Sequence, residues 1–185
     1  MDSSGVHLMA SVATLHHAPR SGKTLVAIAA AQGWSDVDSS KHGWTLREHQ
    51  REALMMLAAR KVAVCKEDVS SSTVIWVCSS LIVAKQLLDE WIRKLDSIEC
   101  KVVCSLDEDS FGGGEVVVTD ESELRTLLRS KRERQLILVT SYHSVHKIHA
   151  ALGDINTNNP SLIVLDEAHN VHTPTRWFLW GAKKS

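Results

Sequence analysis

The chain has 185 residues, with 21 Lys and Arg against 22 Asp and Glu, and a formal net charge of −1. Its 44% hydrophobic and 23% charged residues are typical of a globular protein and exclude a wholly disordered chain. The near-zero net charge argues against a polycationic nucleic-acid binder, although it is compatible with a local basic groove. No apolar run approaches the roughly 20 residues that span a bilayer. The first residues also lack the cationic region and apolar core of a secretory signal.

Short apolar runs rich in β-branched residues alternate with amphipathic segments along the chain. We predict strands at residues 8–15, 73–78, 101–106, 115–119, 136–140 and 161–165. Helices are predicted at residues 25–31, 47–60, 84–95 and 121–131, the last opened by a capping box of Asp120 and Glu123. Several apolar runs, such as VIWV, LILV and LIVL, are continuous, which is typical of parallel strands covered on both faces. The pattern predicts an α/β fold, a doubly wound and mostly parallel sheet with helices on both faces and right-handed crossovers.

The cysteines are few and have no CxxC spacing: Cys65, Cys78, Cys100 and Cys104. We expect small buried side chains in a reducing compartment, in preference to disulfides or a zinc site. The sequence therefore predicts an intracellular protein, with the nucleus favoured over the cytoplasm.

A first candidate site is the segment HAPRSGKT, between a predicted strand and a predicted helix. A phosphate-binding loop needs inward backbone N–H groups, a lysine for the β- and γ-phosphates, and a hydroxyl for Mg²⁺. Ser21, Gly22, Lys23 and Thr24 supply the SGKT half of that pattern. The usual first glycine of GxxxxGKT falls on His17, so the entry to the loop is atypical. The alternative is an ordinary helix N-terminus with chance residues.

A second candidate site is the segment SLIVLDEAH, in which an apolar run ends in two acids. Asp166 and Glu167 are therefore predicted at the carboxyl end of a buried strand, where open α/β sheets bind ligands. One carboxylate there can hold Mg²⁺ through water, and the next can orient or deprotonate an attacking water. The alternative is a strand that simply stops in a polar turn.

Together these motifs resemble the first RecA-like domain of superfamily 2 helicases and translocases. The resemblance extends to VIWVCSSLIVAKQLLDEW, similar to the family's motif Ia, and to LVTSYHSV, similar to its TSY/TTY segment. WTLREHQREAL resembles the LRxxQ element that reads adenine in the family. LREHQ, TSYHSV and DEAHNVHTPT look closest to Swi/Snf-type remodellers and to the motor subunits of type I and III restriction enzymes. The resemblance covers roughly residues 18–175.

The resemblance implies a role for each matching residue. Lys23 and Thr24 would bind the phosphates and Mg²⁺, and Gln50 would recognise the adenine of ATP. Asp166 would hold Mg²⁺, Glu167 would activate water, and His169 would link the nucleotide site to the nucleic-acid face. Hydroxyls that match the family's contacts to a sugar-phosphate backbone belong to Ser79, Ser80, Thr140 and Ser141.

The sequence departs from the family pattern in its order and extent. Gln50 follows Lys23, whereas the adenine-reading element precedes the phosphate loop in the family. We therefore divide the chain into an atypical N-terminal segment, residues 1–43 with the phosphate loop at 17–24, and the remainder of a single RecA-like domain, residues 44–185. The family's motif III and second RecA-like domain, which supplies an arginine finger, do not appear. We expect no unwinding by this chain alone.

The leading hypothesis is an ATP-binding half of a nucleic-acid-dependent ATPase that uses ATP and Mg²⁺. Its partners would be DNA or RNA and a protein or segment that supplies the second domain. The main alternative is a helicase-like scaffold or binding module with little or no ATP turnover. A different P-loop NTPase such as a kinase is a poorer alternative, because LIVLDEAH and TSYHSV would remain unexplained.

Overall fold

The computed structural model describes residues 22–35, 40, 43–95, 98–105, 116–153 and 160–168. The predicted strand at 8–15 and the residues His17, Ser21 and His169 lie outside these ranges. The chain forms two compact units, Met1–Lys66 and Glu67–Ser185. No helix in the described part of the chain is long and apolar enough to cross a membrane.

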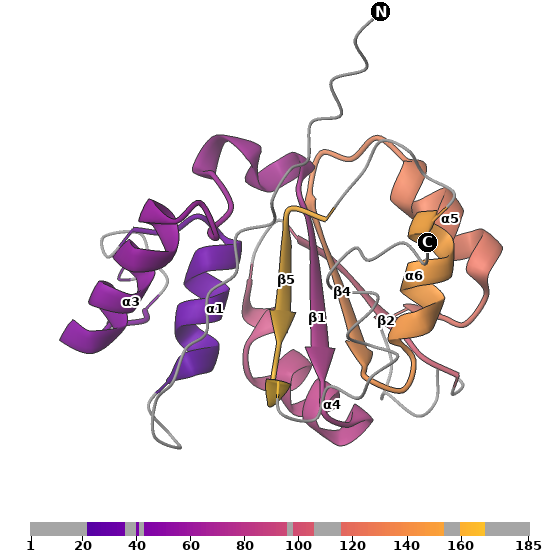
Figure 1. Ribbon diagram of the computed structural model, residues 1–185, viewed down its shortest axis with the longest axis horizontal. Coiled ribbons are helices and arrows are strands. Elements are labelled where there is room, and N and C mark those ends of the chain that lie inside the picture. The colour runs from indigo at the N-terminus through magenta and orange to yellow at the C-terminus, as the bar shows by residue number, and fades with distance from the viewer. Residues whose placement is uncertain are drawn as a thin grey trace, which may run out of the picture. The chain divides into compact units, whose positions relative to one another are not determined.

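The second unit is built on a sheet of five strands in the order β3-β2-β4-β1-β5 (Figure 1). Every pair of neighbouring strands is parallel. The strands are β1 Thr73–Cys78, β2 Ile98–Val103, β3 Val116–Val118, β4 Gln135–Ser141 and β5 Leu162–Leu165. The predicted α/β class with a mostly parallel sheet is confirmed.

Helices cover both faces of this sheet, as predicted. Ile75 and Val77 of β1 pack in one core cluster with Leu124 of α5 (Glu121–Arg129) and Ile148 of α6 (Val145–Gly153). Because successive side chains in a strand point to opposite faces, Val74, Trp76 and Cys78 point the other way, and all of them are buried too. That second face is covered by α4 (Leu81–Glu90), which contacts β1 and β4.

The central strands are apolar because no face of them meets water. Every residue of β1 and of β4 is buried. Full burial of a Leu, Ile or Val side chain contributes about 1.5–3 kcal/mol relative to exposure, so these two strands supply much of the stability of the unit. This is the physical basis of the continuous runs VIWV and LILV, which a half-exposed strand would not tolerate.

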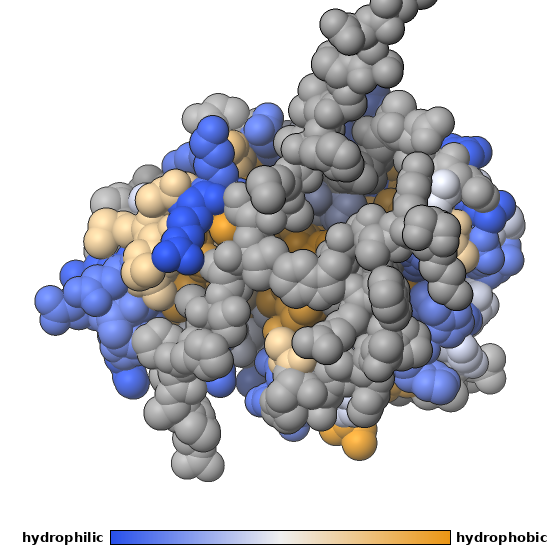
Figure 2. All heavy atoms as spheres, viewed as in Figure 1, coloured by the Kyte–Doolittle hydropathy of each residue, from blue (hydrophilic) through white to orange (hydrophobic). Residues whose placement is uncertain are grey.

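Side-chain caps fix where the helices of this unit begin. The Ser80 hydroxyl accepts a hydrogen bond from the Val83 N–H at 3.3 Å, and the Asp120 carboxylate accepts one from the Glu123 N–H at 3.3 Å. The α5 helix then buries Leu124 and Leu128 and exposes its polar side, which gives the hydrophilic surface at the right edge of Figure 2. The predicted start of α5 is confirmed.

The structure corrects several predicted boundaries, most of all those of one strand and one helix. The strand predicted at 101–106 runs instead from Ile98 to Val103, because it pairs with β4 along its whole length, from Ile98 beside Gln135 to Val103 beside Thr140. The helix predicted to reach residue 95 ends at Glu90. Trp91 leaves the helical region with φ −128°, and a 3-10 turn, η2 Ile92–Lys94, follows.

The expectation of small buried cysteines holds for only part of the set. Cys78 and Cys104 are buried, Cys100 is partly buried and Cys65 is exposed, and all four are free thiols. Cys65 lies just before the 3-10 helix η1 (Lys66–Ser71), outside any strand. The prediction was wrong for Cys65.

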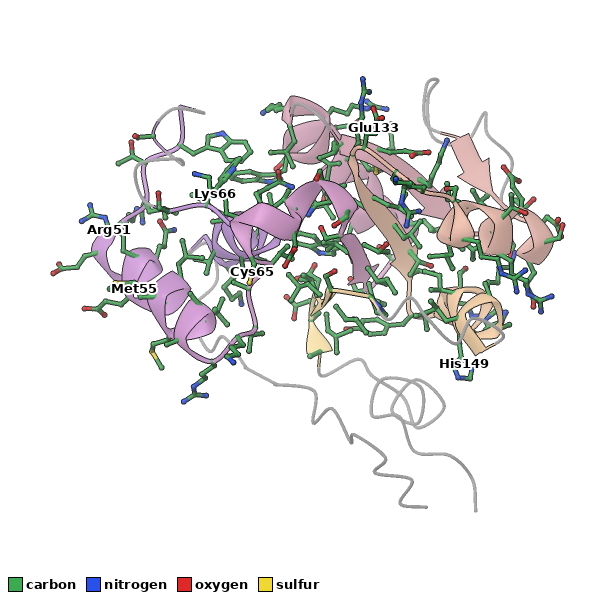
Figure 3. The ribbon with its side chains drawn as sticks, turned by 90° about the horizontal axis from the view of Figure 1, so that it is seen from above. Arg51, Met55, Cys65, Lys66, Glu133 and His149 are labelled. Atoms are coloured by element: carbon green, nitrogen blue, oxygen red, sulfur yellow. The ribbon has the colours of Figure 1, made fainter. Side chains whose placement is uncertain are left out.

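In the described residues of the first unit, the helices α1 (Lys23–Ala31) and α3 (Glu48–Ala59) are in contact. The buried residues of α3 are Gln50, Ala53, Leu54 and Leu57, which share one helix face. Arg51 and Met55 lie on the exposed side and point outward from α3 (Figure 3).

The helices α1 and α3 end in the same way. After α1, Gly33 has φ 59° and the Trp34 N–H donates to the Ala29 carbonyl at 2.9 Å. After α3, Lys61 has φ 55° and the Val62 N–H donates to the Leu57 carbonyl at 2.9 Å. These are Schellman endings, in which a left-handed residue satisfies the last carbonyl groups of the helix. Glycine fits that position in α1, whereas a lysine occupies it in α3.

Candidate functional site

The carboxyl edge of the sheet brings together residues that are far apart in the sequence. The strands β4, β1 and β5 are neighbours and parallel, so their carboxyl ends lie at the same edge. Tyr142 follows β4, Ser79 follows β1, and Asp166 and Glu167 follow β5. The two acids therefore lie where the sequence predicts them, directly beyond a parallel strand at the edge that binds ligands in such sheets.

The turn that carries the two acids is fixed by backbone hydrogen bonds. The Asp166 N–H donates to the Val77 carbonyl at 2.9 Å, which extends the pairing of β5 with β1 by one residue. The Asp166 carbonyl accepts a hydrogen bond from the Tyr142 hydroxyl at 2.8 Å. Asp166 is partly buried and Glu167 is exposed. Glu167 has φ 52°, a left-handed conformation that residues with a Cβ seldom adopt.

The electrostatics of this edge are set by burial and by the Asp166 carboxylate. Burial raises the pKa of the Cys78 thiol to about 12, and the charge of Asp166 raises it too. Burial likewise raises the pKa of the Tyr142 hydroxyl to about 12, with further contributions from Asp166, Cys78 and Glu167. Both groups are neutral at physiological pH, so the acidic groups beyond β5 are the carboxylates of Asp166 and Glu167.

A negative, partly buried carboxylate fits Mg²⁺, which prefers oxygen ligands and is bound through one or two carboxylates together with substrate phosphates. Asp166 meets that requirement for one ligand. Groups of three or more His, Cys, Asp or Glu side chains that could hold a metal by themselves are absent from the described residues. Any Mg²⁺ held here would therefore take its other ligands from water, hydroxyls or a bound phosphate.

Sequence reasoning did not assign a role to Tyr142. It placed this residue within the TSY-like segment but selected only the two hydroxyl residues before it. The signal in the sequence was its position, immediately after a buried strand that ends beside the acids. Its contact with Asp166 depends on the strand order, because β1 lies between β4 and β5.

The hydroxyls predicted to contact a nucleic-acid backbone have different surroundings. Thr140 is fully buried and its hydroxyl donates to the Val103 carbonyl at 2.7 Å. Ser141 is 5% exposed, with its hydroxyl 3.5 Å from that of Ser144. Ser80 is partly buried and caps α4, and Ser79 is exposed. Nucleic-acid contact by these residues stays a prediction, and Ser79 is the most accessible of the four.

The SGKT residues in the described part of the chain form the beginning of α1. Gly22 has φ 82° and ψ 31° and is the N-cap, and its carbonyl accepts from the N–H groups of Leu25 and Val26 at 3.1 and 3.3 Å. Lys23 and Thr24 are the first two residues of the helix and are partly buried. The first N–H groups of a helix have no partner within it, and the helix dipole favours anions at this end. The local geometry suits a phosphate group.

Gln50 lies directly against Gly22, although the two residues are far apart in the sequence. A Cβ atom placed on Gly22 would approach the Gln50 Nε2 atom closer than 3.0 Å. Gln50 is only 5% exposed, and its Oε1 atom accepts a hydrogen bond from the Arg47 N–H at 2.8 Å at the start of α3. In the structure, the Gln50 side chain therefore bonds the start of α3 and lies against the SGKT segment. Adenine recognition by this side chain stays a prediction.

Comparison with known proteins adds little to this geometry. No protein-family model matches the sequence, and no curated protein matches it. One similar solved structure is that of a nuclease-deletion mutant of the Type ISP restriction-modification enzyme LlaGI in complex with a DNA substrate mimic. It has a TM-score of 0.48 and 19% sequence identity over 66% of this chain, which spans 10% of that chain. A likeness this weak has no bearing on function.

Proposed function

We propose that this chain is an ATP-binding domain of a nucleic-acid-dependent ATPase of the helicase or translocase type. The observation that carries the proposal is the Asp166–Glu167 pair, directly beyond a parallel strand at the carboxyl edge of the sheet. Two acids at that position are costly for a strand that merely ends, because their charges repel each other and one of them is partly buried. A role in magnesium-dependent phosphate chemistry would explain why two acids stand at this position.

In the proposed reaction each residue acts on the nucleotide or its metal. Lys23 and the first N–H groups of α1 bind phosphate oxygens. The Thr24 hydroxyl and the Asp166 carboxylate would be Mg²⁺ ligands, and Mg²⁺ would neutralise charge on the phosphates. The exposed Glu167 carboxylate accepts a proton from the attacking water, so that phosphoryl transfer goes to water. His169 would couple this site to a nucleic-acid strand, with Ser79 as one contact.

The carboxylates of Asp166 and Glu167 also restrict the form in which ATP can bind. ATP alone would be repelled by Asp166 and Glu167, whereas Mg²⁺ bound to ATP would be attracted by these carboxylates. We therefore expect binding of Mg-ATP and no binding of ATP in the presence of EDTA.

Thermal unfolding of the purified chain tests this proposal. A ligand at about 100 times its dissociation constant stabilises the native state by about 2.7 kcal/mol. We expect Mg-ATP to raise the melting temperature of the natural chain, and expect the shift to be lost in Lys23→Ala and in Asp166→Asn. Lys61→Ala is the matched control, because it removes an exposed lysine of the same unit and should retain the shift.

A folded chain that shows no shift with Mg-ATP would contradict the proposal. The alternative would then be a non-catalytic scaffold or binding module. One observation favours that alternative: the Gln50 oxygen is engaged by the Arg47 N–H, and its amide nitrogen lies against Gly22. ATP turnover that rises when single- or double-stranded DNA or RNA is added would exclude it.

A further inference from the structure

Tyr142 connects three neighbouring strands at the carboxyl edge of the sheet. It directly follows β4, its N–H donates to the Cys78 carbonyl at the end of β1 at 3.1 Å, and its hydroxyl donates to the Asp166 carbonyl beyond β5 at 2.8 Å. Since β1 lies between β4 and β5, the side chain reaches across one strand to hold the end of the next.

The carbonyl that Tyr142 holds belongs to the peptide group joining Asp166 to Glu167. Rotation of that group changes ψ of Asp166 and φ of Glu167 together. Glu167 has φ 52°, which residues with a Cβ avoid and which persists only where the surroundings impose it. The Asp166 N–H bond to Val77 restrains one side of this turn, and the Tyr142 hydroxyl restrains the other.

We propose that Tyr142 is a positioning residue that fixes the Asp166–Glu167 peptide group and so sets the direction in which the Glu167 carboxylate leaves the sheet. The consequence for catalysis rests on the function proposed above. Left-handed residues with a Cβ concentrate at functional sites, where the strain serves the geometry of the site. The fixed carboxylate would then meet the attacking water without a further rearrangement.

The aromatic ring of Tyr142 has a separate, structural contribution. It packs against the core cluster that includes Val77, Leu138 and Val145. Tyr142→Phe retains this packing and removes only the hydroxyl. Because Tyr142 is the only tyrosine in the sequence, no other phenol can substitute for it.

The Asp166 N–H donates to Val77 on the other side of the same turn, so it exchanges when the turn opens. Its hydrogen exchange, measured by NMR, tests the proposal without any ligand. We expect exchange to become about five- to tenfold faster in Tyr142→Phe, the effect of losing one typical hydrogen bond. Thr140→Val is the matched control, because it removes a hydroxyl-to-carbonyl bond of 2.7 Å from the same strand. That bond goes to Val103 of β2, so Thr140→Val should leave Asp166 exchange unchanged.

Steady-state hydrolysis of Mg-ATP gives the second measurement. We expect kcat to fall by on the order of tenfold in Tyr142→Phe, because a misplaced catalytic group slows the chemical step. KM should stay within about twofold, because Lys23, Thr24 and the Asp166 carboxylate are unaltered. The Tyr142 hydroxyl bonds the Asp166 carbonyl, not that carboxylate. A loss of folding would instead lower the fraction of active protein, which an active-site titration would detect.

The two measurements separate the possible failures. Unchanged exchange at Asp166 in Tyr142→Phe would overturn the proposal, and so would faster exchange with an unchanged kcat. If the natural chain neither binds nor hydrolyses Mg-ATP, the proposed function fails and the catalytic consequence fails with it. The exchange rates would still decide whether the Tyr142 hydroxyl fixes the turn.

Discussion

Replacement of Gly22 by alanine tests the geometry at the beginning of α1. Gly22 has φ 82°, and a left-handed conformation costs a residue with a Cβ about 1–2 kcal/mol. The new Cβ would also overlap the Gln50 Nε2 atom. A shift of the Gln50 side chain that breaks its hydrogen bond from the Arg47 N–H would cost about 1 kcal/mol. We expect Gly22→Ala to lower the free energy of unfolding by about 2–3 kcal/mol.

A double-mutant cycle separates the two contributions. Gln50→Ala removes the overlapping atoms, so Gly22→Ala in that background should cost only the backbone part, about 1–2 kcal/mol. Gly43→Ala is the matched control, because Gly43 has φ 76° and a Cβ added to it would meet nothing within 4 Å. Its replacement should cost about 1–2 kcal/mol with or without Gln50.

Equilibrium unfolding in urea supplies the measurement. The sequence has six tryptophans, so 19F NMR of 5-fluorotryptophan is needed to distinguish them. Trp34 and Trp44, whose ring centroids are 5.2 Å apart, report on the first unit. If the effects of Gly22→Ala and Gln50→Ala add to within about 0.5 kcal/mol, the close approach of Gln50 to Gly22 is refuted. A neutral Gly22→Ala would refute the left-handed conformation.

Two further predictions concern positions outside the SGKT segment. Lys61 follows α3 with φ 55°, a position that favours glycine, so Lys61→Gly should raise the free energy of unfolding by about 1 kcal/mol, whereas Lys61→Ala should give no gain. A urea titration in which both variants match the natural chain would contradict this. The raised pKa of Cys78, about 12 against an ordinary 9.0, means that the fold holds the thiol proton more tightly than the unfolded chain. The resulting stability is fully present below pH 9 and is lost as the pH rises towards 12. Between pH 8 and about 10.5, the free energy of unfolding should therefore fall less in Cys78→Ala than in the natural chain. Urea titrations in which it falls equally in both would contradict the raised pKa of Cys78.

Local sequence signals predicted those elements whose causes are local. The strand Thr73–Cys78 has the predicted bounds, because a continuous apolar run can be stable only between two covered faces. The start of α5 follows from Asp120, whose side chain caps the helix without help from any other element. The position of Asp166 and Glu167 at a strand end follows from the apolar run before them.

Other features depend on contacts with residues that are distant in the sequence. The bounds of β2 are set by pairing with β4. The polar Glu99 therefore lies inside this strand, although the residues around it in the sequence do not predict a strand there. The α4 helix ends at Glu90, whereas the amphipathic pattern of the sequence continues to residue 95. The sequence pattern favours a ligand-binding role for Gln50, and only the packing of α3 on α1 brings its amide against Gly22.

The sequence by itself determined the α/β class, the parallel sheet and the carboxyl-edge position of the two acids. These follow from periodicity, burial and the common direction of parallel strands, all of which act along short stretches of chain. Only the tertiary structure decided the strand order β3-β2-β4-β1-β5, the contact of the Tyr142 hydroxyl with Asp166 and the left-handed Glu167. Those features depend on hydrogen bonds between segments 15 or more residues apart, and no local pattern specifies which distant group will complete them.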